Sequence, residues 1–175
     1  MNIRKKMIIR LSLVLGIISI IGMSCKSEKN PPVITSGLSV SAVTSTAGGS
    51  YAPRNIVAIW VETNSGTFVK SLAVYAAARK SDLTNWQSKS MGNTVDAATG
   101  ATRTAFGTVT ATWNGKDVTG NVVADGTYKV CMELTDKGDT GNFSSFTFTK
   151  GAAADTKTPD NVPSFSTISI KWMPL

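Results

Sequence analysis

The sequence predicts an all-β fold, an antiparallel β-sandwich of about seven strands with one short helical insert. Short segments rich in β-branched and aromatic residues recur along the chain, several alternate apolar with polar residues, and glycine- and asparagine-containing turns separate them. The 175 residues are 42% hydrophobic, which is enough for a single core. We therefore expect one folded domain.

The clearest strand pair lies at residues 55–63 and 67–75, where an Asn-Ser-Gly turn separates two segments rich in β-branched and aromatic residues. This pattern predicts a β-hairpin. The first segment is apolar on both faces, with Ile59 and Val61 on one and Trp60 on the other. Strands buried on both faces have this composition, so we expect it to be central in its sheet.

Residues 76–91 lack alternation, and we expect them to hold one short helix that includes Leu83 and Trp86. Further strands are expected at 108–113, 127–135, 143–150 and 165–172, and the polar residues 151–163 are expected to form a loop. Alternate residues of these strands should form the core: Val109, Ala111, Trp113, Tyr128, Val130, Met132, Leu134, Phe146, Phe148, Ile168, Ile170 and Trp172.

The N-terminus has the pattern of an export signal. Four basic residues lie among the first ten, and an apolar run extends to Met23. After Arg10 the uninterrupted part of this run is about a dozen residues, whereas a membrane-spanning helix needs roughly 20. We therefore expect residues 1–24 to be a signal peptide rather than a retained anchor.

The segment Ile21-Gly22-Met23-Ser24-Cys25 ends this run and resembles the lipobox of bacterial lipoproteins, from which Gly22 and Met23 depart. The resemblance implies acylation of Cys25, which would anchor the protein to a membrane without a spanning helix. An ordinary cleaved signal that happens to end at a cysteine is the alternative. We expect a location in the cell envelope, in the periplasm or on the outer surface, with the membrane as a partner through the lipid.

The domain boundaries follow from composition. Residues 25–54, rich in Ser, Thr, Gly and Pro, are expected to form the acylated cysteine and a flexible tether, with a possible first strand within 33–45. Residues 55–175 are expected to form the sandwich.

Charge and composition argue against several classes of function. The net charge of +7 includes four cations of the signal, and no Lys/Arg cluster with interleaved aromatic residues remains after it, so nucleic-acid binding is excluded. Histidine is absent, which removes Ser-His-Asp and Cys-His catalysis. With Cys25 acylated, Cys131 has no partner in the chain. It is then either a buried small hydrophobic residue or a thiol that pairs between chains.

Residues 113–128 contain three turn sites, at Asn114-Gly115, Gly120-Asn121 and Asp125-Gly126. This segment resembles the turn signature of the Ig-like domain of flagellar hook-capping proteins and other exported modules. The resemblance implies an Ig-like sandwich. Asp117 and Asp125 fit caps of tight turns better than calcium ligands, because no DxDxDG loop is present.

A motif between the helical insert and the next strand suggests chemistry. The segment DAATGATR resembles the acceptor motif for covalent attachment of flavin mononucleotide (FMN) in exported redox proteins, an Asp, two variable residues, Ser or Thr, then Gly-Ala-Thr. The matching positions are Asp96, Thr99, Gly100, Ala101 and Thr102. The resemblance implies that a flavin transferase joins the flavin phosphate to the Thr102 hydroxyl.

The residue types of the motif suit this modification. Gly100 and Ala101 lack bulk, so the backbone can enter another enzyme's cleft, and Arg103 can pair with the phosphodiester. The alternative is a plain turn, in which Asp96 and Thr99 act as caps, Gly100 takes a positive φ and nothing is attached.

The chain from Pro53 onward also resembles a family of predicted periplasmic proteins known only as a domain of unknown function (2271-type). The shared features are APRNIVAIWVET, a Trp near the middle, DAATGATR and the WNGKD turn, over about 120 residues. The resemblance implies an extracytosolic fold, and some relatives accompany flavin-dependent electron transfer.

These patterns lead to one main hypothesis and two rivals. The main hypothesis is an exported, lipid-anchored carrier of covalent FMN in extracytosolic electron transfer, with a flavin transferase and envelope redox proteins as partners; Trp86 or Trp113 could stack on the flavin. The first rival is an Ig-like assembly or adhesion module without a cofactor, which binds through strand edges or a Thr-rich face. The second is a small enzyme using Asp96, Asp117 or Asp125, the only candidate acids. We expect no catalytic residues and no metal in the carrier.

Overall fold

The computed structural model describes residues 36–91, 93 and 98–175. The predicted signal peptide, Cys25, residues 26–35 of the predicted tether and Asp96 lie outside the described residues. Within the described part, no helix is long and apolar enough to cross a membrane.

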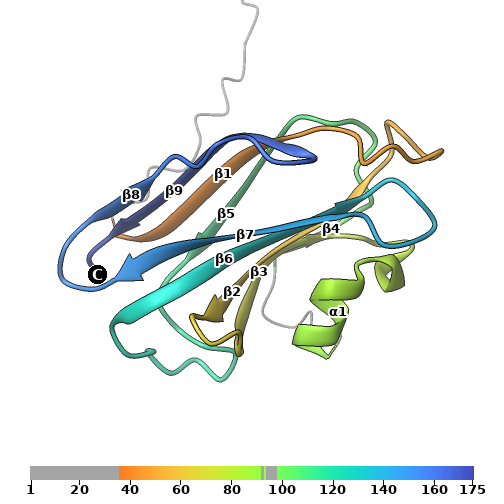
Figure 1. Ribbon diagram of the computed structural model, residues 1–175. Helices are drawn as coiled ribbons and strands as arrows, with labels where there is room; N and C mark the ends of the chain where they lie inside the picture. The colour runs from red at the N-terminus through yellow and green to blue at the C-terminus, as the bar shows by residue number, and fades with distance from the viewer. Residues whose placement is uncertain (1–35, 92, 94–97) are drawn as a thin grey trace, which may run out of the picture. The chain divides into compact units, whose positions relative to one another are not determined.

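Two β-sheets form the domain (Figure 1). One has four strands in the order β5-β1-β9-β8, and the other has five in the order β4-β3-β2-β6-β7. All neighbours are antiparallel except β3 and β4, which are parallel. The strands are β1 (Gly37–Thr44), β2 (Ile56–Thr63), β3 (Phe68–Tyr75), β4 (Ala98–Gly100), β5 (Thr108–Trp113), β6 (Gly126–Thr135), β7 (Asn142–Lys150), β8 (Asp155–Lys157) and β9 (Phe165–Met173). The predicted all-β sandwich is confirmed.

Strand β2 is the centre of the five-stranded sheet, between β3 and β6. Its side chains alternate between two separate apolar clusters. Ile59 and Val61 belong to the core between the sheets, and Trp60 belongs to a second cluster on the opposite face. The prediction of a central strand covered on both sides is therefore confirmed.

The core between the sheets contains the alternate residues that the sequence singled out. Trp113 is at its centre, with its ring 5.6 Å from that of Tyr128 and 6.2 Å from those of Phe148 and Trp172. Edge-on and tilted arrangements at these distances are favourable for aromatic rings. All the predicted core residues are buried here except Phe146, which is half-buried and packs against the cluster.

The outer face of the five-stranded sheet is covered by the predicted helical insert. It consists of a short 3-10 helix, η1 (Lys80–Asp82), and helix α1 (Thr84–Ser90), with Trp86 fully buried beneath α1 and its Nε1 donating to the Ser71 hydroxyl at 2.9 Å. Cys131 and Glu133, which the strand pattern placed on the face opposite the core, are therefore also buried.

Glu133 holds the start of α1. Its Oε1 accepts from the backbone N–H of Asn85 at 3.1 Å and from the Asn85 side-chain amide at 2.9 Å, and its Oε2 accepts from the backbone N–H of Trp86 at 2.8 Å. The first N–H groups of a helix have no partners within the helix, so a carboxylate from β6 satisfies them.

Strand β1 lies within residues 33–45, so the possible first strand expected there is confirmed. It lies between β5 and β9, and Leu38, Val40 and Ala42 are buried in the core between the sheets. Residues assigned to the tether before position 55 thus form an inner strand of the sandwich. Its Ser-rich alternate positions had the composition of a linker, but the buried positions between them are apolar.

Two short strands exceed the seven expected. Strand β8 lies within residues 151–163, which were predicted to be a loop, and pairs with β9. Strand β4 pairs with β3 so that Gly100 lies opposite Tyr75. A Cβ atom on Gly100 would lie 2.6 Å from the Tyr75 ring, so the ring occupies the space that any other side chain would need.

Replacing Glu133 with alanine tests the support of α1. Glu133→Ala removes the acceptor of the buried Trp86 N–H and of the partly buried Asn85 N–H, so we expect the free energy of unfolding to fall by about 2 kcal/mol. Denaturant unfolding followed by tryptophan fluorescence measures it. Asp160→Ala removes the same charge at an exposed position and should change stability by less than about 0.5 kcal/mol. Equal stability of the two variants would contradict the assigned role.

Replacing Gly100 with alanine tests the packing of β4 against Tyr75. The added methyl group must displace the ring, so Gly100→Ala should cost about 1–3 kcal/mol of stability. The exposed neighbour provides the control, since Ala101→Ser should be neutral. In the double variant Gly100→Ala/Tyr75→Leu, the leucine is smaller than the tyrosine ring and leaves room for the added methyl group. The stability losses of the two single variants should therefore not add in the double variant. Strict additivity in denaturant unfolding would argue against the contact.

Candidate functional site

Thr102, which the sequence motif indicated, lines a cavity of about 400 Å³. We call it the arginine cavity. It is formed where the start of β2, the segment after β3 and the segment after β4 meet. Its lining residues are Tyr51, Arg54, Ala78, Arg79, Thr102, Arg103 and Thr104.

Backbone contacts bring these three segments together. Asn55 and Arg103 form an isolated antiparallel bridge, in which each N–H donates to the other's carbonyl at 3.0 Å. The N–H of Ala78 donates to Oγ1 of Thr102 at 3.2 Å. Two hydrogen bonds between main-chain groups and one from a main-chain N–H to the Thr102 side chain therefore fix the wall of the cavity.

Thr102 lies at an accessible position in this wall. Its side chain is half-buried, the preceding Ala101 is exposed, and the hydroxyl donates to no acceptor within the described residues. Gly100 belongs to β4 and does not have a positive φ, so the positive φ that the turn alternative placed at Gly100 is wrong. For Thr99 the structure describes only the backbone, which pairs with Val74.

The arginines have different surroundings. Arg79 packs its guanidinium 4.0 Å from the Tyr51 ring centroid and forms an ion pair with Asp82 at 3.7 Å. Arg103 lies 5.7 Å from the centroid of the Tyr75 ring and donates to the Thr108 carbonyl at 3.4 Å. Its Nε is buried and has no partner in the described part of the chain. Arg54 is exposed. Within the described residues, neither Arg54 nor Arg103 forms an ion pair.

The loop that carries Tyr51 and Arg54 is held by Asp136. This fully buried carboxylate accepts from the Thr46 hydroxyl and from the backbone N–H groups of Ala47 and Gly49, and the Asp136 carbonyl accepts from Tyr51. The sequence motif indicated Thr102 and Arg103 but missed Tyr51, Arg54 and Arg79. Only their residue types could have suggested them, since they are far from the motif along the chain.

Two other sets of predicted residues lie elsewhere. Trp86 and Trp113 are buried, and both indole N–H groups are bonded within the domain, so neither presents a ring for a flavin. In the turn after β5, Oδ1 of Asp117 accepts from the Thr119 hydroxyl and from the N–H groups of Thr119 and Asn121. The Thr119 hydroxyl and these amides lower the pKa of Asp117. Asp125 pairs with Lys150. Asp117 thus supports the structure of its own turn, and Asp125 links the segment before β6 to the end of β7.

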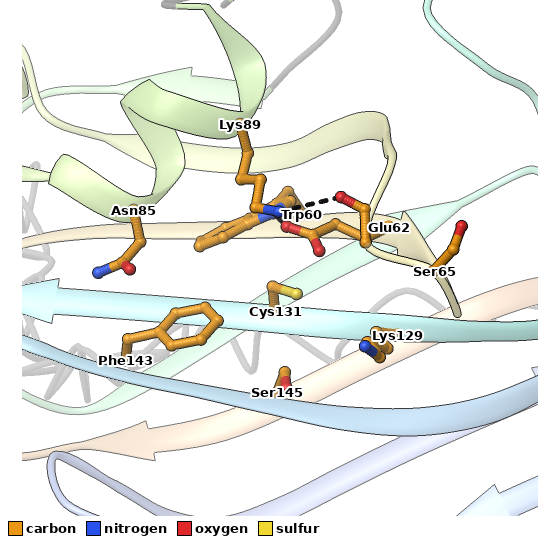
Figure 2. Close-up of a pocket in the computed structure, with 10 residues that line it drawn as sticks. Trp60, Glu62, Ser65, Asn85, Lys89, Lys129, Cys131, Phe143 and Ser145 are labelled. Atoms are coloured by element: carbon orange, nitrogen blue, oxygen red, sulfur yellow. Dashed lines mark hydrogen bonds between the residues drawn. The ribbon is translucent and has the colours of Figure 1, made fainter.

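A second cavity, of about 300 Å³, lies beside α1 on the outer face of the five-stranded sheet. Figure 2 shows Lys89 extending from α1 toward Trp60 and Glu62, with Cys131 and Phe143 on the opposite side. Glu62 is almost fully buried and accepts from the Trp60 Nε1 at 2.8 Å, and Lys89 donates to the Gly66 carbonyl at 3.0 Å.

The surroundings of the thiol in the wall of this second cavity favour its protonated form. Burial raises the pKa of Cys131 far above its usual value, and the nearby Glu62 carboxylate raises it further. The thiolate is the nucleophilic form, so a thiol held protonated does not react. Its complete burial fits the small-hydrophobic role and leaves no surface for pairing between chains.

Comparison with known proteins identifies the family. No curated protein and no solved structure matches the chain. The family model described as "Predicted periplasmic protein (DUF2271)" matches residues 38–161, which is more than half of the chain and runs from β1 to beyond β8. The matched residues include Thr102 and every residue that lines the arginine cavity. The chain therefore belongs to this family of predicted periplasmic proteins.

Proposed function

We propose that the protein is an exported, lipid-anchored carrier of FMN attached to Thr102, which takes part in extracytosolic electron transfer. The observation that carries the proposal is the position of Thr102. Thr102, the second threonine of the DAATGATR segment, presents its hydroxyl at a cavity with arginine side chains, where a phosphate ester can be accommodated.

The attachment step balances as a phosphoryl-group transfer. The Thr102 oxygen forms a bond to the phosphorus of an activated flavin nucleotide, such as flavin adenine dinucleotide, and loses its proton to a base of the transferase. The bond between the two phosphates breaks, and AMP leaves. The protein thereby gains FMN less one water.

The chain's own residues have supporting roles in this proposal. Ala78 N–H holds the Thr102 oxygen, and the exposed Ala101 leaves the approach to it open. Arg103, next to Thr102, is placed to counter the negative charge of a phosphodiester. The bound flavin would supply the electron-transfer chemistry, while the protein would tether and orient it.

The membership of a predicted periplasmic family agrees with export of the chain. The lipid anchor rests on the lipobox-like segment that ends at Cys25. An acylated cysteine followed by a short tether would keep a redox carrier close to membrane-bound electron donors and acceptors. We propose envelope redox proteins and a flavin transferase as its partners.

An assembly module without a cofactor is the second candidate. Strand β5 is an edge of the four-stranded sheet, and its outward side chains Thr108, Thr110 and Thr112 are exposed. An exposed edge strand can pair with a strand of another protein. This function becomes the stronger one if no flavin is found on the protein.

Intact-mass analysis of the exported protein tests the attachment. Full-length protein co-expressed with a flavin transferase should gain the mass of FMN less one water and show flavin absorbance. Thr102→Ala should lose both, because it lacks the acceptor oxygen. The matched control is Thr104→Ala, which removes another threonine of the same cavity and should keep the flavin.

The attachment proposal fails if the full-length protein keeps its bare mass while a known acceptor is modified by the same transferase. It also fails if Thr102→Ala retains the flavin.

Cell fractionation tests the anchor. We expect Cys25→Ser to move the protein from the membrane fraction to the soluble fraction, because the acyl chains provide the membrane affinity. Cys131→Ala, which changes the buried cysteine, should stay with the membranes. A Cys25→Ser variant that sediments with the membranes like the unchanged protein would rule out lipidation as the anchor.

A further inference from the structure

The arginines of the folded domain converge on one place. After the predicted signal the chain has only Arg54, Arg79 and Arg103, and all three line the arginine cavity. They come from three segments, before β2, after β3 and after β4, that meet through the Asn55–Arg103 bridge and the Ala78–Thr102 hydrogen bond. The lysines, in contrast, are spread over both sheets and the helix.

The positive charge at this cavity is only partly neutralised. Asp82 pairs with Arg79 at 3.7 Å, and it is the only acidic partner that any of the three arginines has within the described residues. The buried Arg103 Nε donor has no acceptor among the residues that the structure describes. Three guanidinium groups with one carboxylate partner leave a site that favours an anion.

The donors present suit a phosphate group in particular. Guanidinium groups bind phosphate oxygens through paired N–H donors, and three of them line the same cavity. Packing of Arg79 on Tyr51 and the position of Arg103 near Tyr75 limit the freedom of two of the side chains. Less conformational entropy is then lost when the anion binds.

We propose that the arginine cavity is a non-covalent binding site for a phosphate monoester, the phosphate of FMN, that recognises this group whether or not an ester bond to Thr102 exists. This inference deepens the proposed function and rests on it for the identity of the ligand. Recognition of the phosphate would place its phosphorus next to the acceptor oxygen and would hold the flavin's tail after attachment.

Ligand titration of the Thr102→Ala full-length protein tests the site without interference from covalent flavin. By isothermal titration calorimetry, inorganic phosphate and FMN should bind, and riboflavin, which lacks the phosphate, should not. Affinity for both phosphates should fall as salt concentration rises. Adding Arg54→Ala should weaken FMN binding by about tenfold or more, the size expected for one lost hydrogen bond between charged groups.

A matched variant separates the site from general charge. Lys171→Ala removes one positive charge from an exposed position on β9, in the other sheet, and should leave the affinity unchanged. Arg103→Lys keeps the charge but loses the fork of donors, and should also weaken binding. Undetectable phosphate binding, equal binding of riboflavin and FMN, or equal effects of Arg54→Ala and Lys171→Ala would overturn the inference.

The two proposals fail separately. In one case Thr102→Ala binds phosphate, but the unchanged protein keeps its bare mass after exposure to the transferase. This result would support the anion site and overturn covalent attachment. A flavin adduct on the unchanged protein, with no phosphate binding to Thr102→Ala, would support covalent attachment and overturn the non-covalent phosphate site.

Discussion

Strand β2 is buried on both faces, and the positions of the four-stranded sheet and of α1 follow from the need to cover it. Its inward residues, such as Ile59 and Val61, need the four-stranded sheet opposite them, and its outward Trp60 needs the cover of α1. Without the four-stranded sheet or without α1, large apolar side chains of β2 would be exposed to water. The helical insert is thus part of the fold, and Glu133 joins it to β6.

The same strand positions the arginine cavity. Asn55, one residue before β2, exchanges two backbone hydrogen bonds with Arg103, so the segment after β4 is held against the beginning of the central strand. Thr102 is therefore presented by a segment that is paired to a rigid scaffold yet open to solvent. A residue that another enzyme must reach and modify needs this combination.

The sequence predicted the parts of the fold that depend on local pattern. Alternation identified the core face of β5 and β6, and the double apolar character of residues 55–63 identified the central strand. Burial of Glu133 was missed, because it depends on α1 covering that face, whereas burial was one of the two alternatives stated for Cys131. The strand at β1 was expected only as a possibility within the tether, since serines at its half-exposed positions resembled a linker.

The site was predictable only where it is contiguous in sequence. The motif led to Thr102 and Arg103, whereas Arg54 and Arg79 join them only through contacts between distant segments. Tyr51 depends further on the loop that Asp136 holds. Stacking on Trp86 or Trp113 was expected from residue type alone, and burial removes both.

The central claim is that Thr102 carries a flavin in the cell. Its most direct test is tandem mass spectrometry of the peptide that contains Thr102, from protein isolated from the membranes of its own cells. The account predicts a phosphodiester-linked FMN on that threonine. An unmodified peptide, from cells whose flavin transferase modifies other proteins, would contradict it.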